Sequence, residues 1–87
     1  MFVIGAEIGE LHMLTAAFHR QSGTVDQLTS ELSGQLHSTY WQGGAAERFR
    51  AAWETDYQPA LRSLSAALVD ASEEVRRRAE ALHAAGA

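Results

Sequence analysis

The sequence predicts an all-α protein: a hairpin of two long antiparallel helices that pairs with a second hairpin to form a four-helix bundle. Strong helix formers such as Ala, Leu, Glu and Arg dominate long stretches of the chain. Apolar residues recur with helical rather than alternating spacing. The 87 residues are too few to bury a large core alone, which favours association with a partner. We expect one domain over residues 1–87.

The first helix is expected over about residues 5–38. Its apolar stripe steps by three and four residues, the heptad rhythm of helices packed side by side, with Ser22 and Thr29 among its members. A second, overlapping stripe, which includes Gln21, widens the face enough for two neighbouring helices. The apolar residues that we assign to the core or to a partner interface are Ile8, Leu11, Leu14, Phe18, Val25, Leu28, Leu32 and Leu36.

A turn is expected over about residues 39–44, where helical spacing stops and paired glycines follow two aromatics. So short a connection makes neighbouring helices antiparallel. The aromatic residues near this end can pack in the core and also form a recognition surface, since Trp is favoured in binding hot spots. These aromatics are Tyr40, Trp41, Phe49 and Trp53.

The second helix is expected over about residues 45–84. Pro59 conflicts with this, because proline in a helix interior removes a backbone hydrogen bond. The apolar spacing keeps its phase on both sides of Pro59, so we expect a kinked but continuous helix. Its apolar stripe passes through Ala60, Leu64 and Ala67. The larger residues assigned to the core or to a partner interface are Phe49, Trp53, Tyr57, Leu61, Leu64, Leu68 and Val75.

Charge and composition argue against several classes of function. The net charge of −4 disfavours nucleic acid and anionic membrane surfaces, both of which attract clustered cations. The chain has no cysteine, which excludes disulfides and thiol chemistry. No apolar run approaches the ~20 residues of a membrane span, so we expect no stable membrane insertion. Residues 1–13 lack the cationic start of a cleaved secretory signal.

No pattern of catalytic or ligand-binding residues emerges. His12 and His19 would lie about 10 Å apart along a helix, too far to share a metal ion. His37 and His83 fall at opposite ends of the hairpin. There is neither a nucleophile elbow nor a glycine-rich phosphate loop. We therefore expect no enzyme activity, no cofactor and no metal.

The region from Trp41 onward carries a resemblance to a known family. Trp41-Gln42-Gly43 lies between two helical segments, and Gly44-Ala45-Ala46-Glu47-Arg48-Phe49, Trp53 and Gln58-Pro59-Ala60-Leu61 follow it. This run resembles the Trp-x-Gly (WXG) family, the small proteins of type VII secretion systems that include the early secretory antigenic target kind. The likeness extends over essentially the whole chain.

The resemblance implies hairpins that dimerise antiparallel, often as heterodimers of two related chains, although a homodimer is also possible. It implies a cytoplasmic protein that is exported as a folded dimer, without a cleaved signal peptide. In the family, a secretion ATPase reads a Tyr-x-x-x-Asp/Glu tail that lies near the Trp-x-Gly turn of the other subunit. Trp41 and Gly43 would then contribute to secretion recognition.

The tail motif is where this sequence departs from the family. The expected tyrosine falls near Leu82 and the expected acid near Gly86, and no tyrosine follows Tyr57. We therefore expect a division of labour, in which a related partner carries the tail and this chain supplies the turn.

Three alternative functions differ from this expectation. A cytoplasmic adaptor or chaperone would pair with the N-terminal hairpin of a larger effector, and a neighbouring reading frame would distinguish it from an exported subunit. A small enzyme or ligand binder would need convergent polar residues in a bundle core, which the pattern lacks. Nucleic-acid binding conflicts with the net charge.

Overall fold

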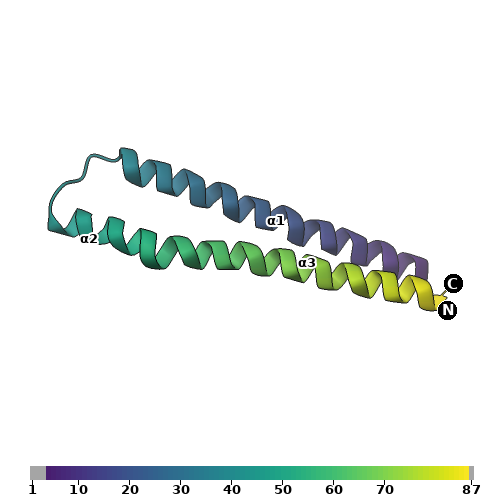
Figure 1. Ribbon diagram of the computed structural model, residues 1–87. Coiled ribbons are helices and arrows are strands. Elements are labelled where there is room, and N and C mark those ends of the chain that lie inside the picture. Colours follow the sequence, from purple (N-terminus) through teal and green to yellow (C-terminus); the bar gives the residue numbers. More distant parts are fainter. Residues whose placement is uncertain (1–3, 87) are drawn as a thin grey trace.

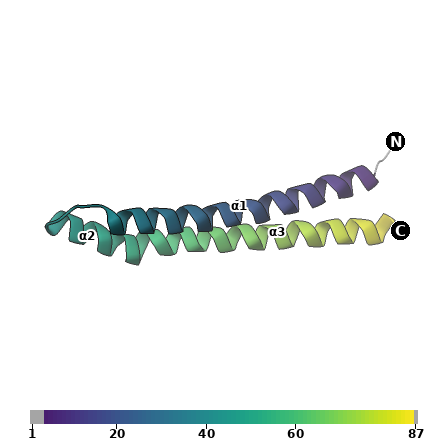
Figure 2. The same cartoon turned by 90° about the horizontal axis from the view of Figure 1, so that it is seen from above.

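Two long antiparallel helices form the whole of the described structure, a computed structural model that covers residues 4–86 (Figures 1 and 2). Helix α1 runs over Ile4–Ser38, and residues 39–43 form the connection. The second helix comprises α2 (Gly44–Ala52), one π-helical turn (Trp53–Tyr57) and α3 (Gln58–Gly86). Residues 4–86 contain no strand, so the predicted all-α hairpin is confirmed. The expectation about a signal peptide falls partly on residues 1–3, outside the described residues.

The π-helical turn explains how the second helix accommodates Pro59. Pro59 has no N–H to donate to the carbonyl four residues earlier. At the residue before it, the Gln58 N–H donates to the Trp53 carbonyl, five residues back, so the backbone stays helical. The second helix is continuous, as predicted. The expectation that the apolar spacing keeps its phase was wrong, because a π turn contains one extra residue.

The extra residue moves the buried stripe by one position along the second helix. Before the π turn the stripe runs through Ala46 and Trp53, and after it through Leu61, Ser65 and Leu68. Residues that would have continued the earlier phase turn outward instead. This change of phase determines which side chains contact α1.

The buried positions of the seam between α1 and the second helix are occupied by small side chains. Within residues 5–86 no large side chain is fully buried. The buried residues are Ser22, Thr29, Ala46, Ser65, Ser72 and Ala79. Small residues allow two helix backbones to approach closely, so the hairpin is held by contact along its length rather than by a broad apolar core.

A reciprocal serine pair joins the helices at mid-length. The hydroxyl oxygens of Ser22 and Ser65 lie 2.8 Å apart. The Ser22 hydroxyl lies 3.0 Å from the Ser65 carbonyl, and the Ser65 hydroxyl lies 3.3 Å from the Ser22 carbonyl. Each hydroxyl can therefore donate to the opposite helix, which removes the desolvation cost of burying it.

The hairpin exposes more surface than a compact protein of its mass. Its extents are 66 × 17 × 15 Å, so it is a rod only two helices wide. Its accessible surface is 6299 Å². A compact monomer of 9.5 kDa should expose about 5,000 Å², which leaves an excess of roughly 1,200 Å². A lone hairpin of this length has no third element to cover its flanks.

Candidate pairing surface

One flank of the hairpin, which we call the apolar side, is lined by uncharged and mostly apolar residues from both helices. Three depressions follow it from the terminal end towards the turn. The first lies between Leu14 and Leu68, and the second between Leu32 and Phe49. The third, about 320 Å³ in volume, lies along the second helix, and no charged side chain lines any of the three. The residues that line these depressions on the apolar side include Leu14, Ala17, Gln21, Leu32, Phe49, Tyr57 and Ala60, with the edges of Phe18, Leu61 and Leu68. Helical spacing adds Leu28, seven residues after Gln21, and Leu64, four residues after Ala60.

The structure separates the predicted interface residues into two groups. One group is half-buried along or beside the seam: Ile8, Leu11, Phe18, Val25, Leu28, Leu36, Trp53, Leu61, Leu68 and Val75. The other group is exposed on the apolar side, with between 42% and 52% of each residue accessible: Leu14, Leu32, Phe49, Tyr57 and Leu64. The first group packs partly within the hairpin, and some of its members also reach the apolar side, whereas the second group has no cover within residues 5–86.

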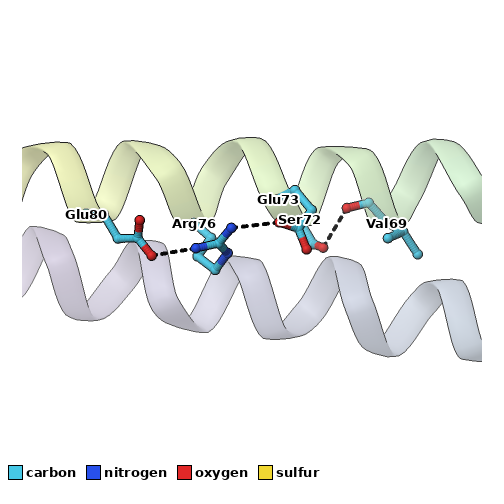
Figure 3. Close-up of polar contacts among 5 residues, drawn as sticks. All are labelled: Val69, Ser72, Glu73, Arg76 and Glu80. Atoms are coloured by element: carbon cyan, nitrogen blue, oxygen red, sulfur yellow. Dashed lines mark hydrogen bonds and ion pairs between the residues drawn. The ribbon is translucent and has the colours of Figure 1, made fainter.

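The opposite flank, the polar side, carries charged and histidine side chains. One of its depressions, about 400 Å³, lies between His12 and His19 of α1 and Glu73 and Arg76 of α3. Figure 3 shows Arg76 between Glu73 and Glu80, with ion pairs to both. The hydrogen bond and the positive charge of Arg76 lower the pKa of Glu73. These charged side chains pair with one another and stay in contact with water, so they do not favour burial of this flank against a partner.

The histidines of the polar side lie apart from one another. Among residues 4–86 no three histidine or carboxylate side chains lie close enough to hold a metal ion. Its second depression, about 410 Å³, is lined by His37, Arg50, Glu54 and neighbouring residues near the turn. His12 and His19 lie along one depression, whereas His37 lies at the other end of the rod.

The turn is shaped by Gly43 and tied down by Arg50. Gly43 has φ +108° and ψ 177°, a backbone region that is essentially restricted to glycine. Its carbonyl accepts the first hydrogen bond of α2, from the Glu47 N–H at 3.1 Å. The Arg50 guanidinium donates to the carbonyls of Trp41 at 2.9 Å and Thr39 at 3.0 Å. The Arg50 side chain of α2 thus binds the connection at two points, Thr39 and Trp41.

An aromatic row leads from the turn onto the apolar side. The ring centroids of Trp41 and Phe49 lie 5.8 Å apart, and those of Phe49 and Tyr57 lie 6.0 Å apart. Trp53 adjoins the row through Tyr57, at 6.4 Å. Tyr40 is 89% exposed and shares no such contact among the described residues. Three of the four aromatics singled out in the sequence therefore gather, and Tyr57 takes the place of Tyr40.

Sequence reasoning missed two polar anchors near the turn. Ser33 accepts hydrogen bonds from the Trp53 indole N–H at 2.9 Å and from the Gln58 amide at 3.3 Å. Arg50 is the other anchor. Ser33 follows Thr29 by four residues and so continues the seam stripe. This helical spacing could have predicted that Ser33 lies at the seam. No spacing signal points to Arg50, because its partners are backbone carbonyls across a turn.

The conformation of Gly43 predicts a contrast between the two adjacent glycines. Gly43→Ala should destabilise the hairpin by about 1–3 kcal/mol, because a Cβ strains the backbone at this φ. Gly44→Ala should be neutral or stabilise by up to about 1 kcal/mol, because Ala favours the first helical turn. Its Cβ would approach only the mobile end of Arg48, at 3.0 Å. Urea unfolding followed by circular dichroism measures both changes, and equal effects would contradict a specific role for Gly43.

Comparison with known protein families, with characterised proteins and with solved structures finds no match to this chain. The Trp-x-Gly resemblance therefore depends on the residues that begin at Trp41. None of the helices over the described residues combines the length and the apolar character that crossing a membrane requires.

Proposed function

We propose that this chain is one subunit of a paired helical-hairpin complex, docked through its apolar side onto a related chain and exported by a type VII secretion system. The observation that carries the pairing is an uncharged flank, shared by both helices, on a rod that exposes roughly 1,200 Å² more than a compact protein of its mass. Exposed apolar side chains that gather on one flank are typical of interaction sites.

The area and length of the flank indicate the kind of partner. A stable interface covers about 800 Å² on each partner, which is within the excess surface. Both α1 and the second helix contribute side chains to the apolar side, so one helix would leave part of it exposed. A second hairpin matches the rod in length and contributes two helices, and the product is a four-helix bundle.

The export half of the proposal depends on the Trp-x-Gly resemblance. Trp41 retains 39% exposure, although its ring lies against Phe49. The connection that carries it is held in one shape by Gly43 and Arg50. A fixed turn with a partly exposed Trp is suited to recognition by another protein. In this proposal the partner chain carries the tail motif, and the secretion ATPase engages the dimer after its assembly in the cytoplasm.

Substitution of Trp41 tests the export half separately from pairing. Trp41→Ala should reduce export at least about tenfold and change the partner affinity less than about threefold, because Trp41 lies in the connection between α1 and α2. Export is measured as the secreted fraction in a host with a working system, and pairing is measured by isothermal titration with the neighbouring Trp-x-Gly chain. Tyr40→Ala, at an exposed neighbour outside the aromatic row, is the matched control. Equal loss of pairing and export would make Trp41 purely structural.

A further inference from the structure

We propose that Gln21 sets the register of docking on the apolar side and selects a partner that presents a hydrogen-bonding group at the same level. This inference rests on the proposed pairing of hairpins. Gln21 lies seven residues after Leu14 and seven before Leu28, so all three share one helical stripe. It is an exposed residue that lines a depression together with Leu14, Ala17, Phe18 and Leu68.

The Gln21 amide is the polar group between Leu14 and Leu28 on this stripe, which continues to Gln35 beside the depression near the turn. Within residues 4–86 it forms no hydrogen bond with another residue, so both its carbonyl and its amino group are available to a partner. A hairpin docked on the apolar side would remove water from this amide. A buried amide without a partner is costly, and one that meets a matching polar group costs less but still loses its water.

Register follows from the spacing of the stripe. If the docked hairpin slips by one heptad, the polar group that it offers to Gln21 moves to the level of Leu14 or Leu28, and both sides are left unsatisfied. A stripe of leucines alone would allow such a slip, because after the slip each leucine would still face an apolar side chain of the partner. A polar residue between two leucines of the stripe therefore disfavours a slip of one heptad, at some cost in affinity.

The position of Gln21 along α1 makes the test quantitative. Gln21 is seventeen residues from Ile4 and seventeen from Ser38, at the middle of the helix. In an antiparallel pair with a second copy, the two Gln21 side chains lie at the same level. Position 14 of one copy then lies level with position 28 of the other. A related partner chain needs its own polar group at mid-length.

The experiment uses a second copy of the chain as the probe and sedimentation equilibrium as the measurement. Gln21→Leu should tighten self-pairing at least about tenfold, because the desolvated amide is removed. Two double variants then displace the amide by one heptad in opposite directions: L14Q/Q21L and Q21L/L28Q. Both have the composition of the natural chain. Mixed together, they should pair with each other at least about tenfold more tightly than either pairs with itself, because the displaced amides meet only in the mixed pair.

Two results would overturn the inference: self-pairing of Q21L that equals that of the natural chain, or double variants that pair no better together than apart. Far-UV circular dichroism of each variant confirms that the hairpin remains helical. Adding Leu64→Asp to Q21L separates failure of this inference from failure of the proposed function. Loss of pairing in Q21L/L64D supports the apolar side as the docking surface. Undiminished pairing would show that the proposed surface itself is wrong, whatever Gln21 does.

Discussion

Leu64→Asp is expected to abolish pairing while the hairpin itself stays folded. Leu64 is 48% exposed on the apolar side, so the free hairpin can keep the carboxylate in water. A docked partner would desolvate that charge with no cation opposite it, which costs about 3 kcal/mol or more. Partner affinity should fall at least about 100-fold, as measured by isothermal titration. The free energy of unfolding of the unpaired chain should change by less than about 0.5 kcal/mol.

Ala66→Asp is the matched control for Leu64→Asp. Ala66 is exposed two residues further along α3, and it lies seven residues before Glu73, a residue of the polar side. The same charge is added to the same helix, but towards the opposite flank. Pairing should be unchanged within about threefold. If A66D and L64D weaken pairing equally, the assignment of the apolar side is wrong.

Ser65→Leu is expected to disrupt the hairpin. Ser65 is 6% exposed, and its hydroxyl oxygen lies 2.8 Å from that of Ser22. A leucine here would force the backbones apart, at about 1–3 kcal/mol for overpacking, and this separation would also break the hydrogen bond from the Ser22 hydroxyl to the Ser65 carbonyl. The combined loss of about 3 kcal/mol should lower Tm by about 12–24 °C in a domain of this size. Thermal unfolding monitored by circular dichroism measures it.

Two further variants show whether volume or hydrogen bonding dominates at the serine pair. Ser63→Leu places the same side chain at an exposed position of α3 and should change stability by less than about 0.5 kcal/mol. The double variant S22A/S65A removes both hydroxyls together and should cost about 1 kcal/mol or less, because no buried group is left unsatisfied. A large loss in S22A/S65A and a small one in S65L would contradict the close-packed seam.

The helices and the turn could be predicted from the sequence, because helical spacing and paired glycines are local signals. The stripe that packs inside the hairpin could not. Hydropathy favours Leu64 over its neighbour Ser65, yet Ser65 lies in the seam and Leu64 faces outward. Close helix approach leaves room only for a small side chain opposite Ser22, and the π turn before Pro59 shifts the stripe by one residue. Both causes are tertiary or backbone effects that a sequence period does not record.

The candidate surface could be predicted only as a set of residues without a division between core and interface. The sequence identified faces wide enough for two neighbours, and the structure assigns Phe18 and Leu61 to the seam and Leu14 and Leu64 to the exposed flank. Arg50 was not predicted, because its hydrogen bonds to the connection depend on the path of the backbone. Gln21 was placed on the second stripe of the first helix from spacing alone, which is where the structure has it.

Light scattering after size-exclusion chromatography tests the central claim, that this hairpin is half of a larger bundle, most directly. The chain is measured alone and mixed in equal amounts with the product of the neighbouring reading frame, with circular dichroism to confirm that it is folded. We predict that the mixture contains a complex with the mass of one copy of each chain, or that the chain alone has twice its mass of 9.5 kDa. A well-folded monomer of 9.5 kDa in both samples would contradict the account.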